Sequence, residues 1–307
     1  MADAFRGRGA VNAFGIRRDI GKMNRNIRVA AIHDLSGIGR CSLTVILPLL
    51  STMGIQVCPV PTAILSSHTG GFGDVAMRDL TDYIPQVLSH YKRLGTGFDC
   101  VYSGFLASNE QTGAVMDFFD EYKSSFKVVD PVMADNGKPY RTCGEKLRKR
   151  MGELVKKADL ITPNVTEAAM LLGEEPYQPN LTVGQMKSFL VRLSEKGPST
   201  VVITSVYSDG KACNIGYDRT SSRFWCVPYK AVDASYPGTG DAFASVLIGS
   251  ILRGDSLPLA MNRASSFLEF AIKTTYGYSA ETREGIMIEE CLGFLMENPT
   301  LCDYEPL

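Results

Sequence analysis

The sequence lacks several features that each point to a definite class of protein. None of its apolar runs approaches the ~20 residues that a membrane-spanning helix needs, so we expect a soluble protein without a membrane partner. The formal net charge is only −1, which gives no electrostatic reason to expect a nucleic acid as partner. With only three histidines in the chain, a zinc site built mainly from histidine is not expected.

The cysteines form no C-x-x-C pair. The chain has eight of them, scattered along its length, which is typical of free thiols in a reducing compartment. The N-terminal stretch also has no apolar core of the kind found in secretory signals. Together these absences predict a cytoplasmic protein.

Two common nucleotide-binding motifs are also missing. No G-x-x-x-x-G-K-[ST] stretch occurs, which excludes a Walker A loop, and no G-x-G-x-x-G stretch occurs, which argues against an ordinary dinucleotide site. Any nucleotide site must therefore be built from other residues.

The first 28 residues differ in charge from the rest. They carry seven basic and two acidic residues, and an arginine-rich, acid-poor leader can target an organelle. We expect instead that residues 1–27 form a peripheral or disordered extension, or that translation begins at Met23. Residues 28–307 show no repeat, low-complexity tract or linker, and are expected to form one domain.

Short apolar strands alternate with amphipathic helices through the remainder of the chain. This order predicts an α/β fold of three layers, with a mainly parallel central sheet and helices on both faces. A polar, glycine-rich stretch at 66–74 predicts a lid or turn. The expected strands are 27–32, 55–65, 98–106, 126–133, 158–164, 200–205 and a hairpin of 211–218 with 222–229; the expected helices are 43–54, 77–93, 109–123 (capped by Asn109), 144–157, 165–173, 182–195, 239–253, 257–276 and 284–297.

The stretch "GTGD" at 238–241 opens an expected helix that is otherwise apolar. Glycines at 238 and 240 allow a tight turn that exposes backbone N–H groups, and a helix N-terminus favours an anion. Such a bend suits a phosphoryl group in transfer. Asp241 is placed to accept a proton from an attacking hydroxyl. A plain acidic cap on a buried helix explains the same residues.

Oxygen-rich side chains follow two other expected strands. Asn164 and Glu167 lie three residues apart in the first turn of a helix, so they share one side of it. An amide and a carboxylate suit a hydrated magnesium ion, although these two residues on their own favour an ordinary helix cap with Glu at its third position. Asp130 ends an apolar strand, where a charge needs a metal ion or a basic group beside it.

Six motifs, in matching order over about residues 28–276, resemble the vitamin-kinase branch of the ribokinase superfamily. The likeness is closest to pyridoxal and pyridoxamine kinases, with hydroxymethylpyrimidine kinases next. The motifs are "HDLSGIGR", "SSHTGG", "DPVMADNGKPY", "ADLITPNVTEAAMLLG", "VVITS" and "PGTGDAFAS".

The resemblance implies ATP-dependent phosphorylation of a primary alcohol on a heteroaromatic ring, with magnesium and potassium as accompanying ions. It implies that Asp241 is the catalytic base, that Gly238, Thr239 and Gly240 supply the anion hole, and that 134–140 forms a flap over ATP. Family members are often dimers, so a homodimer is expected. The further implied roles are Asn164 and Glu167 for magnesium and the ATP phosphates, Asp130 and Asp135 near the metal, Thr162 for a monovalent cation, Thr204 and Ser205 for phosphate, and Val232 and Tyr236 for adenine.

On the acceptor side the motifs are mixed. "SSHT" is similar to a stretch of the pyridoxal kinases, which implies that His68 and Thr69 face the pyridine, with Phe105 as a ring contact or a core aromatic. Those kinases usually have a serine where this chain has Ile32, whereas Asp34 and Ser36 resemble residues of hydroxymethylpyrimidine kinases. The latter usually carry cysteine at the position of Asp241. We expect the pyridine vitamers pyridoxal, pyridoxine and pyridoxamine as acceptors, with the pyrimidine alcohol as the alternative.

Two other functions were weighed against this one. A ribokinase-like sugar kinase needs an early glycine-pair and asparagine motif and a larger lid, neither of which the sequence has. A non-catalytic vitamin-binding protein of the same fold is expected to have lost the base or the magnesium acid, but both Asp241 and Glu167 are present.

Overall fold

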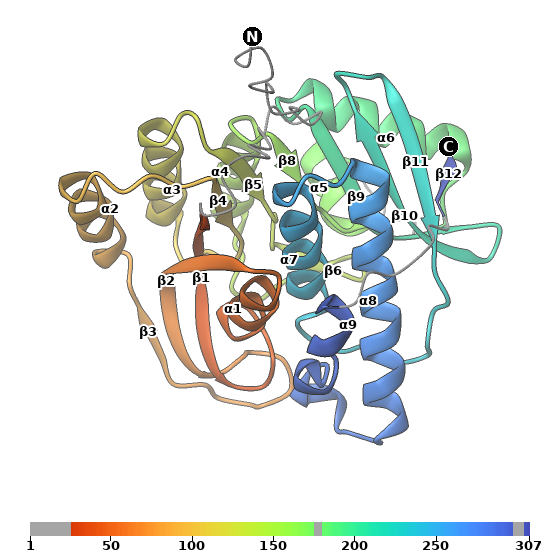
Figure 1. The fold of residues 1–307 in the computed structure, drawn as a ribbon, viewed down its shortest axis with the longest axis horizontal. Helices are drawn as coiled ribbons and strands as arrows, with labels where there is room; N and C mark the ends of the chain where they lie inside the picture. Colours follow the sequence, from red (N-terminus) through yellow and green to blue (C-terminus); the bar gives the residue numbers. More distant parts are fainter. Residues whose placement is uncertain (1–25, 175–179, 297–303) are drawn as a thin grey trace, which may run out of the picture.

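The fold is that of a computed structural model, which describes residues 26–174, 180–296 and 304–307 (Figure 1). Within these residues the central sheet has ten strands in the order β12-β11-β10-β9-β8-β5-β4-β1-β2-β3. The strands are β1 (Ile27–Ile38), β2 (Ile55–Ser67), β3 (Met77–Asp79), β4 (Cys100–Ser103), β5 (Phe126–Val129), β8 (Leu160–Ile161), β9 (Thr200–Ser208), β10 (Lys211–Asp218), β11 (Arg223–Pro228) and β12 (Glu305–Pro306).

Helices flank the sheet on both faces. They are α1 (Leu43–Thr52), α2 (Tyr83–Arg93), α3 (Asn109–Glu121), α4 (Glu145–Val155), α5 (Val165–Leu172), α6 (Val183–Glu195), α7 (Thr239–Leu252), α8 (Leu257–Gly277) and α9 (Leu292–Met296). None of the helices in the described ranges is both long and apolar enough to cross a membrane.

The centre of the sheet is parallel. Strands β2, β1, β4, β5, β8 and β9 pair in parallel with their neighbours, while β3 on one side and β10, β11 and β12 on the other add antiparallel edges. The predicted α/β fold with a mainly parallel sheet is therefore confirmed. Because all six parallel strands end at one edge of the sheet, the residues that follow them meet there.

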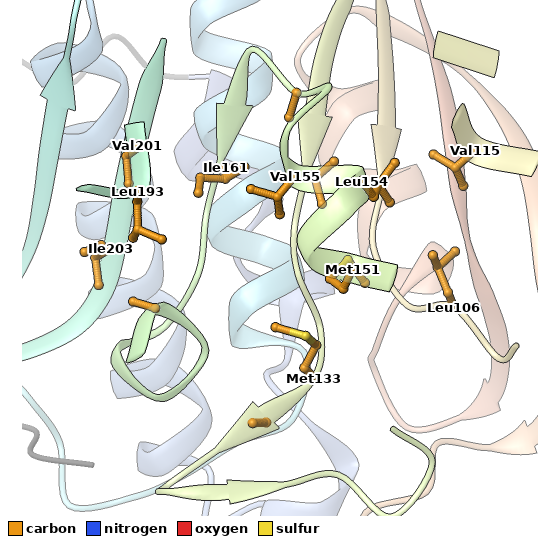
Figure 2. Close-up of a cluster of buried hydrophobic side chains, with 14 of the residues drawn as sticks. Leu106, Val115, Met133, Met151, Leu154, Val155, Ile161, Leu193, Val201 and Ile203 are labelled. Carbon is orange, nitrogen blue, oxygen red and sulfur yellow. The ribbon is translucent and has the colours of Figure 1, made fainter. Parts of the chain in front are cut away.

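Two apolar clusters fill the space between the three layers. In β1, Ala30 and Ile32 pack into the cluster that α2–α6 complete, whereas Val29 and Ala31 pack into the cluster of α1, α7, α8 and α9. This alternation follows from the two-residue period of a strand. Figure 2 shows part of the first cluster, in which Met133 from the loop after β5 joins side chains of the sheet and of α4.

Helix α7 lies between α1 and α8 and is buried from Asp241 to Leu252. Figure 1 shows α7 and α8 side by side across one face of the sheet. Full burial of each large apolar side chain contributes about 1.5–3 kcal/mol, so packing fixes the helix firmly. The buried apolar helix thus holds Asp241, in its first turn, in a fixed position.

Three local predictions are wrong. The helix expected from residue 77 begins at Tyr83, because Met77–Asp79 pairs with β2 as an edge strand. The cap of α3 is Ser108, whose hydroxyl accepts the Gln111 N–H, and Asn109 is the first helical residue. The helix expected over 284–297 is broken: two 3-10 turns precede α9, since the chain turns at Gly285 (φ 74°) and buries Ile286 and Ile288.

A two-stranded sheet was not predicted. Strands β6 (Ala134–Asp135) and β7 (Lys138–Pro139) form a hairpin, with Asn136 and Gly137 in its turn, both at positive φ. Asn-Gly is the preferred pair for a two-residue hairpin turn. The extension predicted over residues 1–27 lies outside the described residues as far as residue 25, so it stays a prediction; Ile27 already belongs to β1.

Candidate active site

The bend before α7 has the geometry that its sequence predicts. Gly238 is the N-cap of α7, with φ at 79°, and a side-chain Cβ there would lie 2.1 Å from the carbonyl oxygen of Arg40. Only glycine meets both conditions. At Gly240 a Cβ would have no atom within 4 Å, so the first turn of the helix is open on that side. The first N–H groups of a helix have no partner within it, and here they favour an anion.

Asp241 is buried, with 7% of its surface exposed, but its neighbours are polar. Oδ1 lies 3.0 Å from Nε2 of His33. Oδ2 accepts the Ser42 N–H at 2.8 Å and the Cys41 thiol at 3.4 Å. Ser42 has φ at 59°, a strained conformation for a non-glycine residue. The loop after β1 is therefore bent so that its backbone holds this carboxylate.

His33 continues the contact away from Asp241. Its Nδ1 lies 3.0 Å from Oδ1 of Asp34, and the Ser36 hydroxyl donates to Oδ2 of Asp34 at 2.8 Å. Sequence reasoning placed Asp34 and Ser36 against the substrate and missed His33. In the structure the four side chains form one buried chain, and Asp34 and Ser36 are 4% and 0% exposed. A histidine directly after an apolar strand, followed by an acid, was the signal in the sequence.

Asp130, which follows β5, lies in the same charged neighbourhood. Burial, and then the charge of Asp241, raise the pKa of Asp130 to about 7, against the opposing charge of His33. Tyr102 at the end of β4 is fully buried, and its hydroxyl has no hydrogen-bond partner within the described part of the chain. Burial and the charges of Asp130 and Asp241 raise the pKa of Tyr102. The negative charge of Asp241 thus disfavours ionisation of Asp130 at this edge of the sheet.

Asn164 and Glu167 form a complete capping box at the start of α5. Each side chain bonds the other residue's backbone N–H at 2.9 Å. Glu167 also accepts the Met133 N–H at 3.0 Å, and burial with the charge of Asp130 raises its pKa. The helix-cap reading of this pair is confirmed, and the magnesium role stays a prediction.

The hairpin β6–β7 is attached to this cap. The amide of Asn164 donates to the carbonyl of Ala134 at 2.8 Å, and the Gly137 N–H donates to the Thr166 hydroxyl at 3.0 Å. Asp135 lies on the hairpin with an exposed side chain that accepts the Asn136 N–H. The segment predicted to cover ATP is therefore tied to the residues predicted to order its phosphates.

The ends of β8 and β9 lie beside the cap. Thr162, after β8, is 4% exposed. Thr204 in β9 forms an isolated parallel β-bridge with Asn164. Ser205 is exposed at a bulge, with φ at 59°, and its N–H donates to the Asn214 side chain. A bulge redirects a strand locally, which turns Ser205 out of the ladder.

The residues predicted at adenine are differently placed. Val232 is half-buried in the segment after β11. Tyr236 is 5% exposed and packs in the apolar cluster with α7, and its carbonyl accepts the Thr239 hydroxyl at 3.1 Å. The Tyr236 ring thus supports the bend from behind, and contact with a nucleotide is left to prediction for both residues.

The loop after β2 folds over the same region. Nε2 of His68 lies 2.6 Å from the carbonyl oxygen of Arg283, and Nδ1 accepts the Gly70 N–H at 3.0 Å, so both ring nitrogens are engaged by the protein. Thr69 beside it is exposed, and Phe105 is half-buried with its carbonyl accepting the Thr62 hydroxyl. The pyridine contacts predicted for His68, Thr69 and Phe105 stay predictions.

Within the described ranges, no group of three or more His, Cys, Asp or Glu lies together in a way that could hold a metal ion. This fits magnesium, which is usually bound by one or two carboxylates together with substrate phosphates and water. Asp130 and Glu167 interact through their charges, and a cation between them would offset the negative charge of both buried carboxylates.

The fold defines a class: a ribokinase-like α/β protein in which polar residues gather at the carboxyl edge of a mainly parallel sheet. The sequence matches the family of phosphomethylpyrimidine kinases over residues 48–286, and the chain belongs to this family. It is an ATP-dependent kinase that acts on an alcohol group, and it is similar to pyridoxal kinases.

Solved structures and a curated relative support this assignment. A protein from Bacteroides thetaiotaomicron, assigned as a phosphomethylpyrimidine kinase and crystallised in a form with pyridoxal, is 44% identical, with a TM-score of 0.89 over 92% of this chain and 100% of that one. Pyridoxal kinase from Lactobacillus plantarum is 30% identical, with a TM-score of 0.82 over 88% of this chain and 96% of that one. The hydroxymethylpyrimidine/phosphomethylpyrimidine kinase of Aquifex aeolicus is 30% identical over 56% of this chain and 66% of its own length. The chain spans only 42% of a second curated relative, a bifunctional enzyme.

Proposed function

We propose that this kinase transfers the γ-phosphate of ATP to the hydroxymethyl group of pyridoxal, pyridoxine or pyridoxamine. The observation that carries the proposal is the position of Asp241, at the open first turn of α7 and beside the bend at Gly238. The form with pyridoxal of the Bacteroides protein, at 44% identity over nearly the whole chain, supports a pyridine acceptor.

In this mechanism the backbone N–H groups of Gly238, Thr239 and Gly240 bind the oxygens of the phosphoryl group, where the helix dipole favours negative charge. Asp241 accepts the proton of the acceptor's hydroxymethyl group. The oxygen of that hydroxymethyl group bonds to the γ-phosphorus as the bond between the γ-phosphorus and ADP breaks. Each carboxylate oxygen has two lone pairs. Oδ2 of Asp241 accepts from Ser42 and Cys41, whereas Oδ1 meets His33 and keeps a second lone pair for the alcohol.

Magnesium would be held near Asp130, Asn164 and Glu167, with Asp135 on the hairpin above and a potassium ion near Thr162. When bound, magnesium neutralises charge on the ATP phosphates. The raised pKa values of Asp130 and Glu167 support this placement, because burial and neighbouring carboxylates disfavour both charges and a cation would offset them. Thr204 and Ser205 are proposed to contact phosphate from β9, and Val232 and Tyr236 to border the adenine.

The pyrimidine alcohol is the second candidate acceptor, favoured by the family match itself. Asp34 and Ser36 are the residues that resemble the pyrimidine kinases. Their side chains bond to each other and to His33, and both residues are buried. Their burial supports the pyridine vitamers over the pyrimidine. We also propose a cytoplasmic homodimer; the seven cysteines of the described ranges, all free thiols, are in keeping with a reducing compartment.

A coupled assay of ADP release tests the proposal with pyridoxal, pyridoxine, pyridoxamine, the pyrimidine alcohol and ribose side by side. We expect the best vitamer to exceed the pyrimidine by at least about tenfold in kcat/KM, since a site built for one ring's polar groups rejects another. Asp117→Asn, an exposed carboxylate on α3, serves as the matched control for variants in the site. A faster reaction with the pyrimidine or with ribose would overturn the acceptor assignment.

A further inference from the structure

His33 is a buried histidine that the mechanism so far does not use. Its ring lies between two carboxylates, with 3.0 Å from Nε2 to Asp241 Oδ1 and 3.0 Å from Nδ1 to Asp34 Oδ1. Only 1% of the residue is exposed. A buried carboxylate needs a compensating charge or hydrogen bonds, and one imidazolium at this point serves both acids.

The ring has little freedom to leave this position. A Cβ at residue 104 would lie 2.0 Å from Nε2, so the glycine that follows β4 leaves the space the ring fills. The ring of Tyr102 meets it edge-on, with centroids 6.2 Å apart. On the far side, the Ser36 hydroxyl holds Asp34. The ring is thus fixed by β1 and β4, and through it the Asp241 side chain is fixed as well.

Three protonation states of His33 fit these distances, and they have different consequences. A neutral ring with its proton on Nε2 donates to Asp241 and accepts the Asp34 N–H, which lies 3.1 Å from Nδ1. A neutral ring with its proton on Nδ1 accepts the Phe105 N–H, which lies 3.2 Å from Nε2. A doubly protonated ring instead donates Nε2–H to Asp241 and Nδ1–H to Asp34. Burial by itself lowers the pKa of histidine, but the charge of Asp241 and the hydrogen bonds with Asp241 and Asp34 raise the pKa of His33 to about 10.

We infer that His33, as an imidazolium between Asp34 and Asp241, is a positioning residue that holds the Asp241 carboxylate correctly turned to accept the proton of the acceptor alcohol. The inference rests on the proposed role of Asp241 as base. It gives Asp34 and Ser36 a function as supports of that histidine. Asp130 and the incoming phosphates add negative charge beside Asp241, and His33 offsets it from the opposite side.

A double-mutant cycle tests the inference, with His33→Asn, Asp241→Asn and the combined variant. We expect His33→Asn to lower kcat by about 10- to 100-fold with less than a threefold change in KM for ATP and alcohol, as an effect confined to the transition state requires. In the Asp241→Asn background the same substitution should lower kcat by less than about threefold, since two side chains in direct contact do not act independently. Equal losses in both backgrounds would overturn the inference.

Nitrogen NMR of the unsubstituted protein tests the same point without an activity assay. The chain has three histidines, so the His33 signals can be assigned through the His33→Asn or the His68→Asn and His90→Asn spectra. We expect both ring nitrogens of His33 to be protonated at pH 8, and Asp241→Asn to lower the pKa of His33. A bare Nε2 at pH 8 would show that the ring accepts from Phe105, and a bare Nδ1 would show that it accepts the Asp34 N–H; either result would overturn the inference.

The two tests separate this inference from the proposed function. If none of the acceptors is phosphorylated, the proposed function fails, while the NMR result still decides the state of His33. If an acceptor is phosphorylated but the ring is neutral, the proposed function stands and the role of His33 falls.

Discussion

Replacing Asp130 with asparagine should stabilise the protein, and more so as the pH rises. The pKa of Asp130 rises from its ordinary value of 3.8 to about 7, mainly through burial and the charge of Asp241. Below pH 4 the group is neutral in the folded and the unfolded chain and costs nothing. Above pH 7 it is ionised in both, and the folded chain carries the full cost. The difference spans about three pH units at about 1.4 kcal/mol each, so the cost reaches about 4 kcal/mol.

The measurement is urea unfolding of Asp130→Asn and the unsubstituted chain from pH 5 to pH 8, with a chelator present. We expect the variant's advantage in free energy of unfolding to grow by about 3 kcal/mol over this range. Differences in hydrogen bonding between the two side chains shift both ends equally and cancel. Asp117→Asn is the control, because its carboxylate is exposed, and should show no such trend. An advantage that stays constant, or shrinks, as the pH rises would refute the assignment of a strained charge to Asp130.

Three further outcomes are expected. Asp241→Asn should cut turnover by about 10²-fold or more while the Kd for ATP, measured by calorimetry, changes little; near-normal turnover would remove Asp241 as base. Gly238→Ala should lower the free energy of unfolding by at least about 1–3 kcal/mol. Gly240→Ala, whose methyl meets no atom within 4 Å, should unfold normally in urea yet lose activity. Equal stability of the two variants would contradict the packing at the bend. Phosphorylation of the acceptor should stop in excess chelator, return with magnesium and rise with potassium, and a preparation that stays fully active in the chelator would exclude the roles given to Asn164 and Glu167.

The sequence was sufficient for the fold and for the parts of the site that are local. Strand and helix periods predicted the sheet and its covering layers, and "GTGD" predicted an open helix start with an acid. The Asn-x-x-Glu spacing predicted the capping box of Asn164 and Glu167, which the structure contains. Each of these signals depends on residues within a few positions of one another, so spacing alone is enough to read them.

Most of the features that the sequence did not predict depend on residues far apart in the chain. His33 and Asp241 are brought together by the stacking of β1 against α7, which no local pattern encodes. The substrate role given to His68 by resemblance stays a prediction, but its contact with the Arg283 carbonyl was not predicted, because it depends on the path of the loop after β2. The helix expected over 284–297 failed because helical spacing does not register the turn at Gly285.

The hydrogen bond from the Ser42 backbone to Asp241 joins positions 199 residues apart. One end emerges early in synthesis and the other only when most of the chain has been made. A growing or truncated polypeptide that lacks either end cannot hold this carboxylate in place, whatever else has already folded. In the proposed mechanism, partly made molecules would therefore not transfer phosphate until Asp241 has been added and has reached the loop after β1.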